Sequence, residues 1–182
     1  VGYMLPYLSQ AVGPQGGVIA EDIQEDFLDK ARAKVAQEHL TNVRFVLGDD
    51  KDPHLPAASA DLILVLDAYH HFDFPDRMLA KLAAALKPEG RLALVEYYKR
   101  KGAMGSGDPD RPLTHIRLDA DDVVKEVEAN GFHVLARWWC PKRGQLPAIR
   151  SMRRRLRVPG IHRSRQRQHR RRRERSTRRA GR

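Results

Sequence analysis

Short apolar segments alternate with longer segments of helical periodicity between Gly17 and Trp139, and this alternation constrains the fold of the 182-residue chain most. Nearly continuous apolar segments are typical of parallel strands, because helices cover both faces of such a sheet. Strands are predicted at residues 18–21, 43–47, 62–66, 92–97 and 132–138, and helices at 25–38, from Pro75 onward and at 119–130. We therefore predict an α/β fold with a doubly wound, mostly parallel sheet.

The positive charge is concentrated at the C-terminal end. The net charge is +11, but residues 150–182 hold 16 Arg, no Lys and one acid, Glu174, and so carry +15. Residues 1–149 therefore carry −4. A segment so charged and so poor in large apolar residues cannot offset its ordering entropy. We predict a folded domain over residues 1–149 and an Arg-rich disordered tail over 150–182.

Two interpretations of the tail stay open. Arg side chains that contact phosphates would form a nucleic-acid-binding arm whose affinity falls steeply with salt. A run of Arg without Lys is also typical of out-of-frame translation of a GC-rich gene, and we favour this interpretation. The tail lacks the apolar face that membrane binding requires, and the longest apolar runs fall far short of the ~20 residues of a membrane span.

The chain contains one cysteine, Cys140, and so can form neither an intramolecular disulfide nor a cysteine-based zinc site. This composition is typical of a reducing compartment, and we predict a cytoplasmic protein. The sequence shows no signal peptide. It begins at Val1 rather than Met, so we expect that residues are missing before it.

Acidic residues follow three of the predicted strands. Asp22 ends the first strand, Asp49 and Asp50 follow the second, and Asp67 follows the third. Ligands of an open α/β sheet bind beyond the carboxyl ends of its strands, and a carboxylate in the position of Asp22 can accept both hydrogen bonds of a ribose diol. A single acid here is equally well explained as a helix cap or turn residue, but together they favour a cofactor site.

Five segments occur in an order that carries a family resemblance. They are Gly2-Tyr3, residues 18–23 (VIAEDI), 42–50 (NVRFVLGDD), 60–67 (ADLILVLD) with Tyr69-His70-His71-Phe72 after it, and 86–92 (LKPEGRL). In this order they resemble the class I S-adenosylmethionine-dependent methyltransferases, over roughly residues 2–132. The resemblance implies a Rossmann-like methyltransferase fold, S-adenosylmethionine as cofactor and methyl transfer to a small-molecule acceptor that the sequence does not identify.

The resemblance also implies roles at the adenosyl end of the cofactor. Asp22 is expected to hold the ribose hydroxyls and Ile23 to pack on the adenine face. Asp49 is expected to accept a hydrogen bond from the adenine amine, while the backbone of Asp50 reads the ring edge. An acidic cleft also suits a cofactor with a cationic sulfonium.

At the methionine end, Gly2 resembles the last glycine of the family's cofactor loop, with Tyr3 as the aromatic residue after it. Gly2 is expected to let the backbone approach the methionine part of the cofactor, and Asp67 to contact that part from its own strand end. The family's first strand and its two earlier loop glycines are missing here. We therefore expect weak or no cofactor affinity. The family's final apolar antiparallel strand, expected after Leu146-Pro147, is replaced by the Arg-rich sequence.

His70 and His71 suggest a metal pair, but adjacent side chains diverge and no third ligand has zinc spacing, so no metal site is predicted. A structural or substrate-pocket role is favoured. If the reaction uses a general base, His70 or His71 is the candidate, since imidazole titrates near neutrality. No catalytic residue is assigned. Tyr97 and Tyr98 are expected either to line the acceptor pocket or to pack on a helix.

Two other functions remain as alternatives. A nicotinamide-dependent oxidoreductase of related fold also uses a ribose-binding acid, but it does not explain Gly48-Asp49-Asp50 or residues 69–72. A nucleic-acid-binding protein would act through the tail alone. The sequence does not indicate an oligomeric state.

Overall fold

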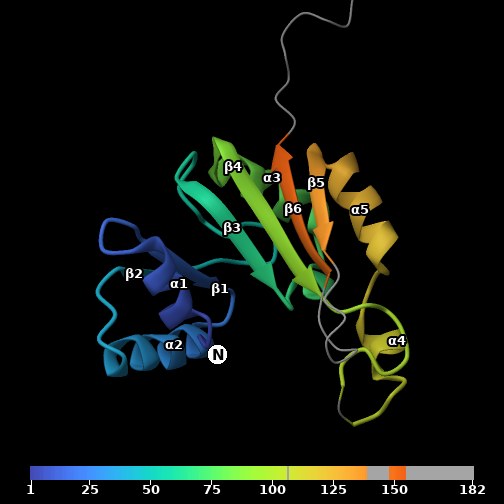
Figure 1. Ribbon diagram of the computed structural model, residues 1–182, viewed down its shortest axis with the longest axis horizontal. Coiled ribbons are helices and arrows are strands. Elements are labelled where there is room, and N and C mark those ends of the chain that lie inside the picture. The colour runs from blue at the N-terminus through green and yellow to red at the C-terminus, as the bar shows by residue number, and fades with distance from the viewer. Residues whose placement is uncertain (106, 139–147, 155–182) are drawn as a thin grey trace, which may run out of the picture.

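The computed structural model describes residues 1–105, 107–138 and 148–154. Helices and strands follow one another in the alternating order that the sequence predicts (Figure 1). The elements are α1 (Leu5–Val12), β1 (Val18–Asp22), α2 (Glu25–Gln37), β2 (Val43–Leu47), β3 (Ala60–Leu66), the 3-10 helix η1 (Tyr69–His71), α3 (Pro75–Ala85), β4 (Leu86–Glu96), α4 (Arg111–His115), α5 (Ala120–Ala129), β5 (Phe132–Trp138) and β6 (Ala148–Arg154).

The strands form two sheets. β1 and β2 pair in parallel, and the larger sheet has the order β3-β4-β6-β5. β3 and β4 are parallel, whereas β6 runs antiparallel to both β4 and β5. β1 lies on the side of β2 that faces β3 (Figure 1), and in the part of the chain that the structure describes no strand joins the two sheets. The predicted α/β fold with parallel strands is confirmed.

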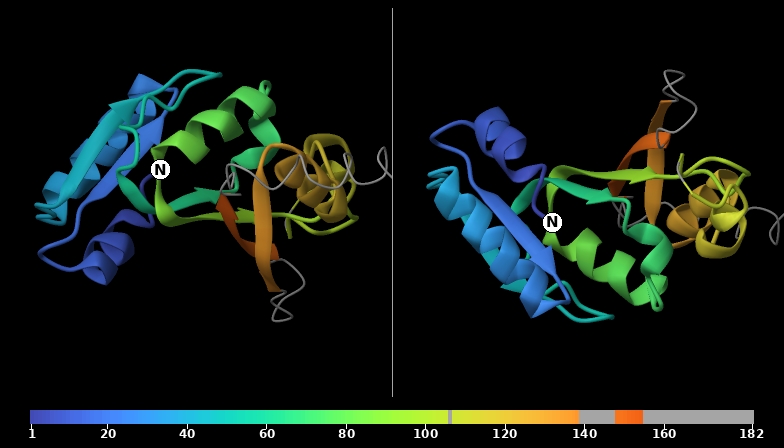
Figure 2. Two further views of the ribbon diagram at one scale, coloured as in Figure 1. Left: turned by 90° about the horizontal axis from the view of Figure 1, so that it is seen from above. Right: turned by 90° about the horizontal axis from the view of Figure 1, so that it is seen from below.

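Each sheet has its own hydrophobic core. In the smaller unit, Leu5 of α1 and Ala31 and Val35 of α2 pack with Val18 of β1. α1 and α2 pack against the same core, and Figure 2 shows α2 lying along one face of β1 and β2. In the larger unit, α3 and α5 cover β3 and β4. Its most deeply buried side chains are Tyr69, Leu79, Leu92, Leu94, Val127 and Phe132.

The predicted elements agree with the structure within a few residues, with one exception in β4. β4 begins at Leu86 rather than at Leu92, and so includes Pro88-Glu89-Gly90, a sequence typical of a turn. The register explains the difference, because Ala60 pairs with Leu86 whereas Leu62 already pairs with Arg91. The turn is therefore an irregularity inside a longer strand.

The predicted boundary between domain and tail at residue 150 is wrong. Arg150 and the four residues after it belong to β6, where Leu94 of β4 pairs with Arg150 and Phe132 of β5 pairs with Arg154. Backbone hydrogen bonding to two neighbouring strands does not depend on side-chain polarity, so an Arg-rich segment can complete a sheet. The prediction that the Arg-rich sequence replaces the last antiparallel strand is thus also wrong for residues 148–154.

Several predictions concern residues that the structure does not describe. The predictions of a disordered tail and of a nucleic-acid-binding arm are now limited to residues 155–182. These residues lie outside the described part of the chain, and so does Cys140. Among the described residues, no helix has both the length and the apolar character needed to cross a bilayer.

Phe132 provides a test of the larger core. Its side chain is fully buried between α5 and the sheet, so the substitution Phe132→Ala should lower the free energy of unfolding by about 3–5 kcal/mol. Leu135, on the same strand, is 45% exposed, and Leu135→Ala should change it by less than about 1 kcal/mol. Urea denaturation of both variants measures the difference, and equal losses would contradict this core.

Candidate functional site

Asp22 and Ile23 lie at the carboxyl end of β1, next to the start of α2. The backbone N–H of Gln24 donates to Asp22 Oδ1 at 3.0 Å, which fixes the carboxylate at the strand end. Asp22 Oδ2 accepts no hydrogen bond from the described residues. Ile23 is 49% exposed, which leaves an apolar side chain in solvent beside this carboxylate. The pair offers an acceptor for hydroxyl groups next to an apolar platform.

Asp49 organises the loop that follows β2. The backbone N–H groups of Lys51 and Asp52 both donate to Asp49 Oδ1 at 2.8 Å. These hydrogen bonds hold the pKa of the Asp49 carboxyl below its ordinary value. Asp49 Oδ2 lies 3.4 Å from His54 Nε2, and Asp50 pairs with Lys51 Nζ at 3.0 Å. One oxygen of Asp49 thus serves the turn, as the alternative interpretation expected, and the other faces a histidine.

Glu21 lies near these two acids, and the sequence analysis did not single it out. Its Oε1 is buried and accepts no hydrogen bond from the described residues. Burial, followed by the charge of Asp22, raises the pKa of the Glu21 carboxyl to about 7. A Cβ at Gly48 would lie only 2.1 Å from Glu21 Oε1, so the glycine makes room for this side chain.

Gly2 and Tyr3 form the approach to α1. Gly2 has a φ of +65°, and a Cβ there would meet the Cβ of Ala31 in α2 at 3.3 Å. Tyr3 is 60% exposed. Figure 1 shows the N-terminus on the side of the molecule toward which the arrowheads of β3 and β4 point. Burial raises the pKa of Tyr97, which follows β4, and the charges of Asp67 and then Tyr3 raise it further. Tyr3 therefore lies close enough to Tyr97 to affect its titration.

Asp67 turns the chain at the end of β3. It is a non-glycine residue with a φ of +52°, and its N–H donates to the carbonyl of Val95 in β4 at 2.8 Å. Burial, followed by the charge of Glu96, raises the pKa of the Asp67 carboxyl. Its neighbours are Glu96, His70 and His115, whereas those of Glu21 are Asp22, Asp49 and His54. The predicted acids therefore fall into two groups, one on each sheet.

His70 and Glu96 form a buried pair between η1 and β4. The side chain of His70 is 2% exposed, and its Nδ1 lies 2.9 Å from Glu96 Oε2. Glu96 Oε2 also accepts the backbone N–H of His70 at 3.2 Å, while Oε1 accepts that of Tyr97 at 2.9 Å. The carboxylate thus fixes the backbone of His70 and lies beside its ring, whose Nδ1 makes no hydrogen bond in the described residues. An acid at the end of an apolar strand was the available signal for Glu96.

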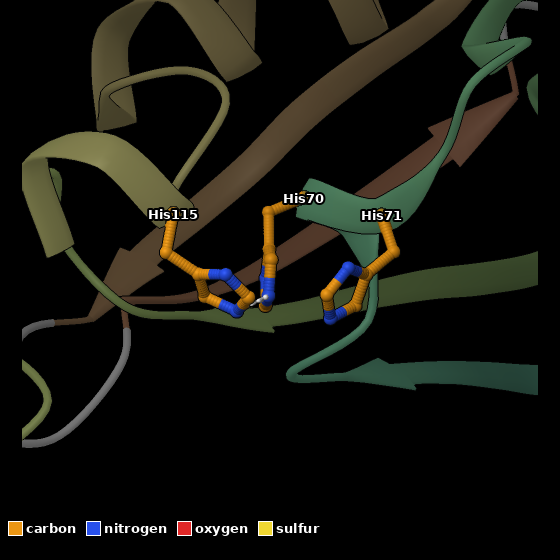
Figure 3. Close-up of side chains that lie close together, drawn as sticks. All are labelled: His70, His71 and His115. Atoms are coloured by element: carbon orange, nitrogen blue, oxygen red, sulfur yellow. Dashed lines mark hydrogen bonds between the residues drawn. The ribbon is translucent and has the colours of Figure 1, made fainter. Parts of the chain in front are cut away.

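His115 at the end of α4 joins the two adjacent histidines of η1. Its Nε2 lies 3.2 Å from Nε2 of His70, and the ligand-type nitrogens of all three rings lie within 4.8 Å of one another. Figure 3 shows His70 between the other two rings. Burial, and next the charge of His70, lowers the pKa of both His71 and His115. No sequence spacing indicates this contact, because a long loop separates the residues.

Glu126 of α5 fixes both segments that carry the histidines. Tyr69, which precedes His70, donates its hydroxyl to Glu126 Oε1 at 2.5 Å. Arg117, two residues after His115, donates to both oxygens of Glu126 at 2.9 and 2.6 Å. Burial, followed by the hydrogen bond of Tyr69 to Glu126, raises the pKa of the Tyr69 hydroxyl. We call these three residues the Glu126 clamp.

Tyr97 and Tyr98 directly follow Glu96, the last residue of β4. A small, largely apolar cavity lies there. It is lined by Leu94, Glu96, Tyr97, Tyr98, Leu118, Ala120 and Val123. The two tyrosines therefore line a cavity, and Glu96 contributes to both this cavity and the histidine cluster.

Comparison with known proteins supports one family. The profile of a family described as a methyltransferase domain matches residues 1–90. The chain is 33% identical over 94 residues to nocamycin O-methyltransferase of Saccharothrix syringae, covering 52% of this chain and 34% of that protein. It is 28% identical over 148 residues to the ubiquinone/menaquinone biosynthesis C-methyltransferase UbiE of Vibrio campbellii, covering 81% of this chain and 48% of that protein. The chain thus spans half or less of the length of these relatives.

Solved structures show the same fold. A SAM-dependent methyltransferase from Aquifex aeolicus is 26% identical, with a TM-score of 0.73 over 83% of this chain and 76% of that one. The [4+2]-cyclase SpnF is 18% identical, with a TM-score of 0.67 over 83% of this chain and 70% of that one. At that identity the second similarity concerns the fold alone.

The raised pKa of Glu21 predicts a pH-dependent stability. Below pH 4.5 its carboxyl is protonated in both the folded and the unfolded state. As pH rises from 4.5 toward about 7, the unfolded state ionises first, so the free energy of unfolding falls, by at most about 3 kcal/mol.

The substitution Glu21→Gln should remove this contribution. Urea denaturation at pH 5 and at pH 8 gives the change in unfolding free energy for each protein. The loss between these pH values should be smaller in the variant, since other titrating groups are common to both. An identical loss would contradict a raised pKa at Glu21.

Proposed function

We propose that the chain belongs to the class I S-adenosylmethionine-dependent methyltransferases and that it transfers a methyl group from this cofactor to a small-molecule acceptor. The observation that carries the proposal is the set of acids at the carboxyl ends of β1, β2 and β3, in a chain whose first half matches the methyltransferase domain. Ligands of such sheets bind at this edge.

The residues at the end of β1 fit the adenosyl part of the cofactor. Asp22 keeps one carboxylate oxygen without a donor among the described residues, and a ribose diol supplies hydroxyl donors for it. The exposed side chain of Ile23 offers an apolar surface for the adenine ring. Asp49 reaches the adenine amine through Oδ2, because its Oδ1 already accepts two backbone hydrogen bonds. The backbone of Asp50 lies next to it in the same loop.

The residues at the end of β3 and β4 serve the methionine end and the acceptor. When bound, the cofactor supplies an electrophilic methyl group on a cationic sulfonium. Asp67 presents its carboxylate from a left-handed turn toward this end, and Gly2 allows close backbone approach. Tyr97 and Tyr98 follow β4 directly after Glu96, and we expect the acceptor to approach beside them.

The homologues named O- and C-methyltransferases act on small molecules by their names, and this supports a small-molecule acceptor here. We also propose that the reaction takes place in the cytoplasm, since a single cysteine excludes an intramolecular disulfide framework.

Cofactor affinity of this chain should be weak. The described residues include no strand between β1 and β3, so the methionine part lacks the contacts that such a strand would provide. We expect a dissociation constant for S-adenosylhomocysteine well above the micromolar range. Saturation-transfer NMR of the ligand detects binding of this strength.

The decisive comparison uses S-adenosylhomocysteine and NAD with the whole chain. Saturation should reach the ribose and adenine protons of S-adenosylhomocysteine. The substitution Asp22→Asn should weaken this binding by about tenfold or more, because a hydrogen bond to a charged acceptor contributes about 1.5–3 kcal/mol. Asp26→Asn is the matched control, since Asp26 is an exposed acid of α2 paired with Lys30.

Binding of NAD in preference to S-adenosylhomocysteine would contradict the proposal and favour an oxidoreductase. Equal effects of Asp22→Asn and Asp26→Asn would contradict the role of Asp22. A micromolar dissociation constant would contradict the expected weakness but support the choice of cofactor.

A further inference from the structure

Three imidazole rings from two separate segments meet beside the end of β4. We propose that His70, His71 and His115 bind a divalent transition-metal ion of the zinc class. Imidazole nitrogen is a preferred ligand of such ions, and three protein ligands with one open position are typical of catalytic zinc sites. This proposal goes beyond methyl transfer, and it does not require that the cofactor be bound.

Two of the ring nitrogens already have the separation that one ion requires. Zinc–nitrogen bonds of about 2.0–2.1 Å in a tetrahedral arrangement place two ligand nitrogens about 3.3 Å apart. Nε2 of His70 and Nε2 of His115 lie 3.2 Å apart. These two nitrogens, one on a ring of η1 and one on a ring of α4, are therefore separated as two ligands of a single zinc ion would be.

Glu96 gives His70 the environment of a metal ligand. Metal-binding histidines characteristically direct their second ring nitrogen at a carboxylate, which fixes the tautomer and the ring orientation. Nδ1 of His70 lies 2.9 Å from Glu96 Oε2, in a pair that is almost fully buried. Nδ1 is buried beside Glu96 without a hydrogen bond in the described residues, so a carboxylate stands ready to accept from it once the ring turns toward an ion. Nε2 is then the atom left for the ion, and it is the atom that faces His115.

His71 completes the set by a side-chain movement. The ligand-type nitrogens of the three rings lie within 4.8 Å of one another, so a small rotation of the third ring suffices to reach the tetrahedral separation. His71 is exposed, and its ring centroid lies 3.9 Å from that of His70 (Figure 3). An exposed side chain changes rotamer easily, so the movement requires no change in the backbone.

The Glu126 clamp holds the two other rings in place. Tyr69 and Arg117 are sequence neighbours of His70 and His115, and both donate to the same carboxylate. Binding two segments to one helix orders the ligand set before an ion arrives, which a preorganised site requires. The fourth position of a tetrahedral ion then accepts a water or an oxygen of the acceptor.

The test uses the full chain without an affinity tag and without S-adenosylmethionine. Co²⁺ is the first probe, because bound Co²⁺ absorbs visible light in a way that reports its ligands. One equivalent should give the spectrum of a four- or five-coordinate ion with nitrogen ligands and without a thiolate band. Addition of Zn²⁺ should abolish the spectrum, and calorimetry then gives the Zn²⁺ affinity.

Single substitutions assign the ligands. His71→Gln and His115→Gln should each lower the Zn²⁺ affinity at least about tenfold, since even the loss of an outer carboxylate lowers metal affinity 10- to 100-fold. His133→Gln is the matched control, because His133 is an exposed histidine of β5 outside the cluster, and it should leave the affinity unchanged. Circular dichroism verifies that each variant is folded.

A wild-type chain that gives no Co²⁺ spectrum would overturn the proposal, and so would Gln variants that retain full affinity. A thiolate band, or an equal loss with His133→Gln, would also overturn it by placing the ion elsewhere. If His115→Gln fails to fold, His71→Gln decides, because His71 is exposed. Failure of metal binding leaves the cofactor measurements unaffected, so the two proposals fail separately.

Discussion

The parallel pairing of β3 with β4 is the constraint on which the acceptor side of the molecule depends. Leu66 pairs with Val95, and the N–H of Asp67 extends the ladder by donating to the carbonyl of Val95. This register brings η1 next to Glu96, which then accepts the backbone N–H of His70. The fully buried residues Leu92 and Leu94 support the pairing from the core, so the chemistry at the strand ends rests on ordinary apolar packing.

The division into two sheets has a consequence for ligand binding. Asp22 and Asp49 belong to the smaller sheet, while Asp67, Glu96 and His70 belong to the larger one. In the described part of the chain no strand connects the sheets by hydrogen bonds. A cofactor that contacts both groups of acids therefore bridges two separately packed cores. Its binding energy must offset the freedom that these cores lose relative to each other, which lowers the affinity.

The sequence predicted most elements because apolar periodicity is local information. It failed at β6, since Arg150 and its neighbours pair through backbone groups that composition does not reveal. The acids at the strand ends were predictable from the fold class, but their division into two groups depends on how the sheets are arranged. His115 was not predictable, because only tertiary packing brings it to His70. Glu96 had a signal, namely an acid directly after an apolar run at residues 92–95.

The arrangement around His70 is hard to explain by stability alone. A buried imidazole beside a buried carboxylate contributes little net stability compared with apolar side chains of the same shape. The rings of His71 and His115 add no apolar core, since His71 is exposed and His115 only partly buried. Glu126 nevertheless fixes both segments through three hydrogen bonds. Such fixed positions without a packing benefit are characteristic of residues that bind a ligand, because binding requires geometry where packing requires only volume.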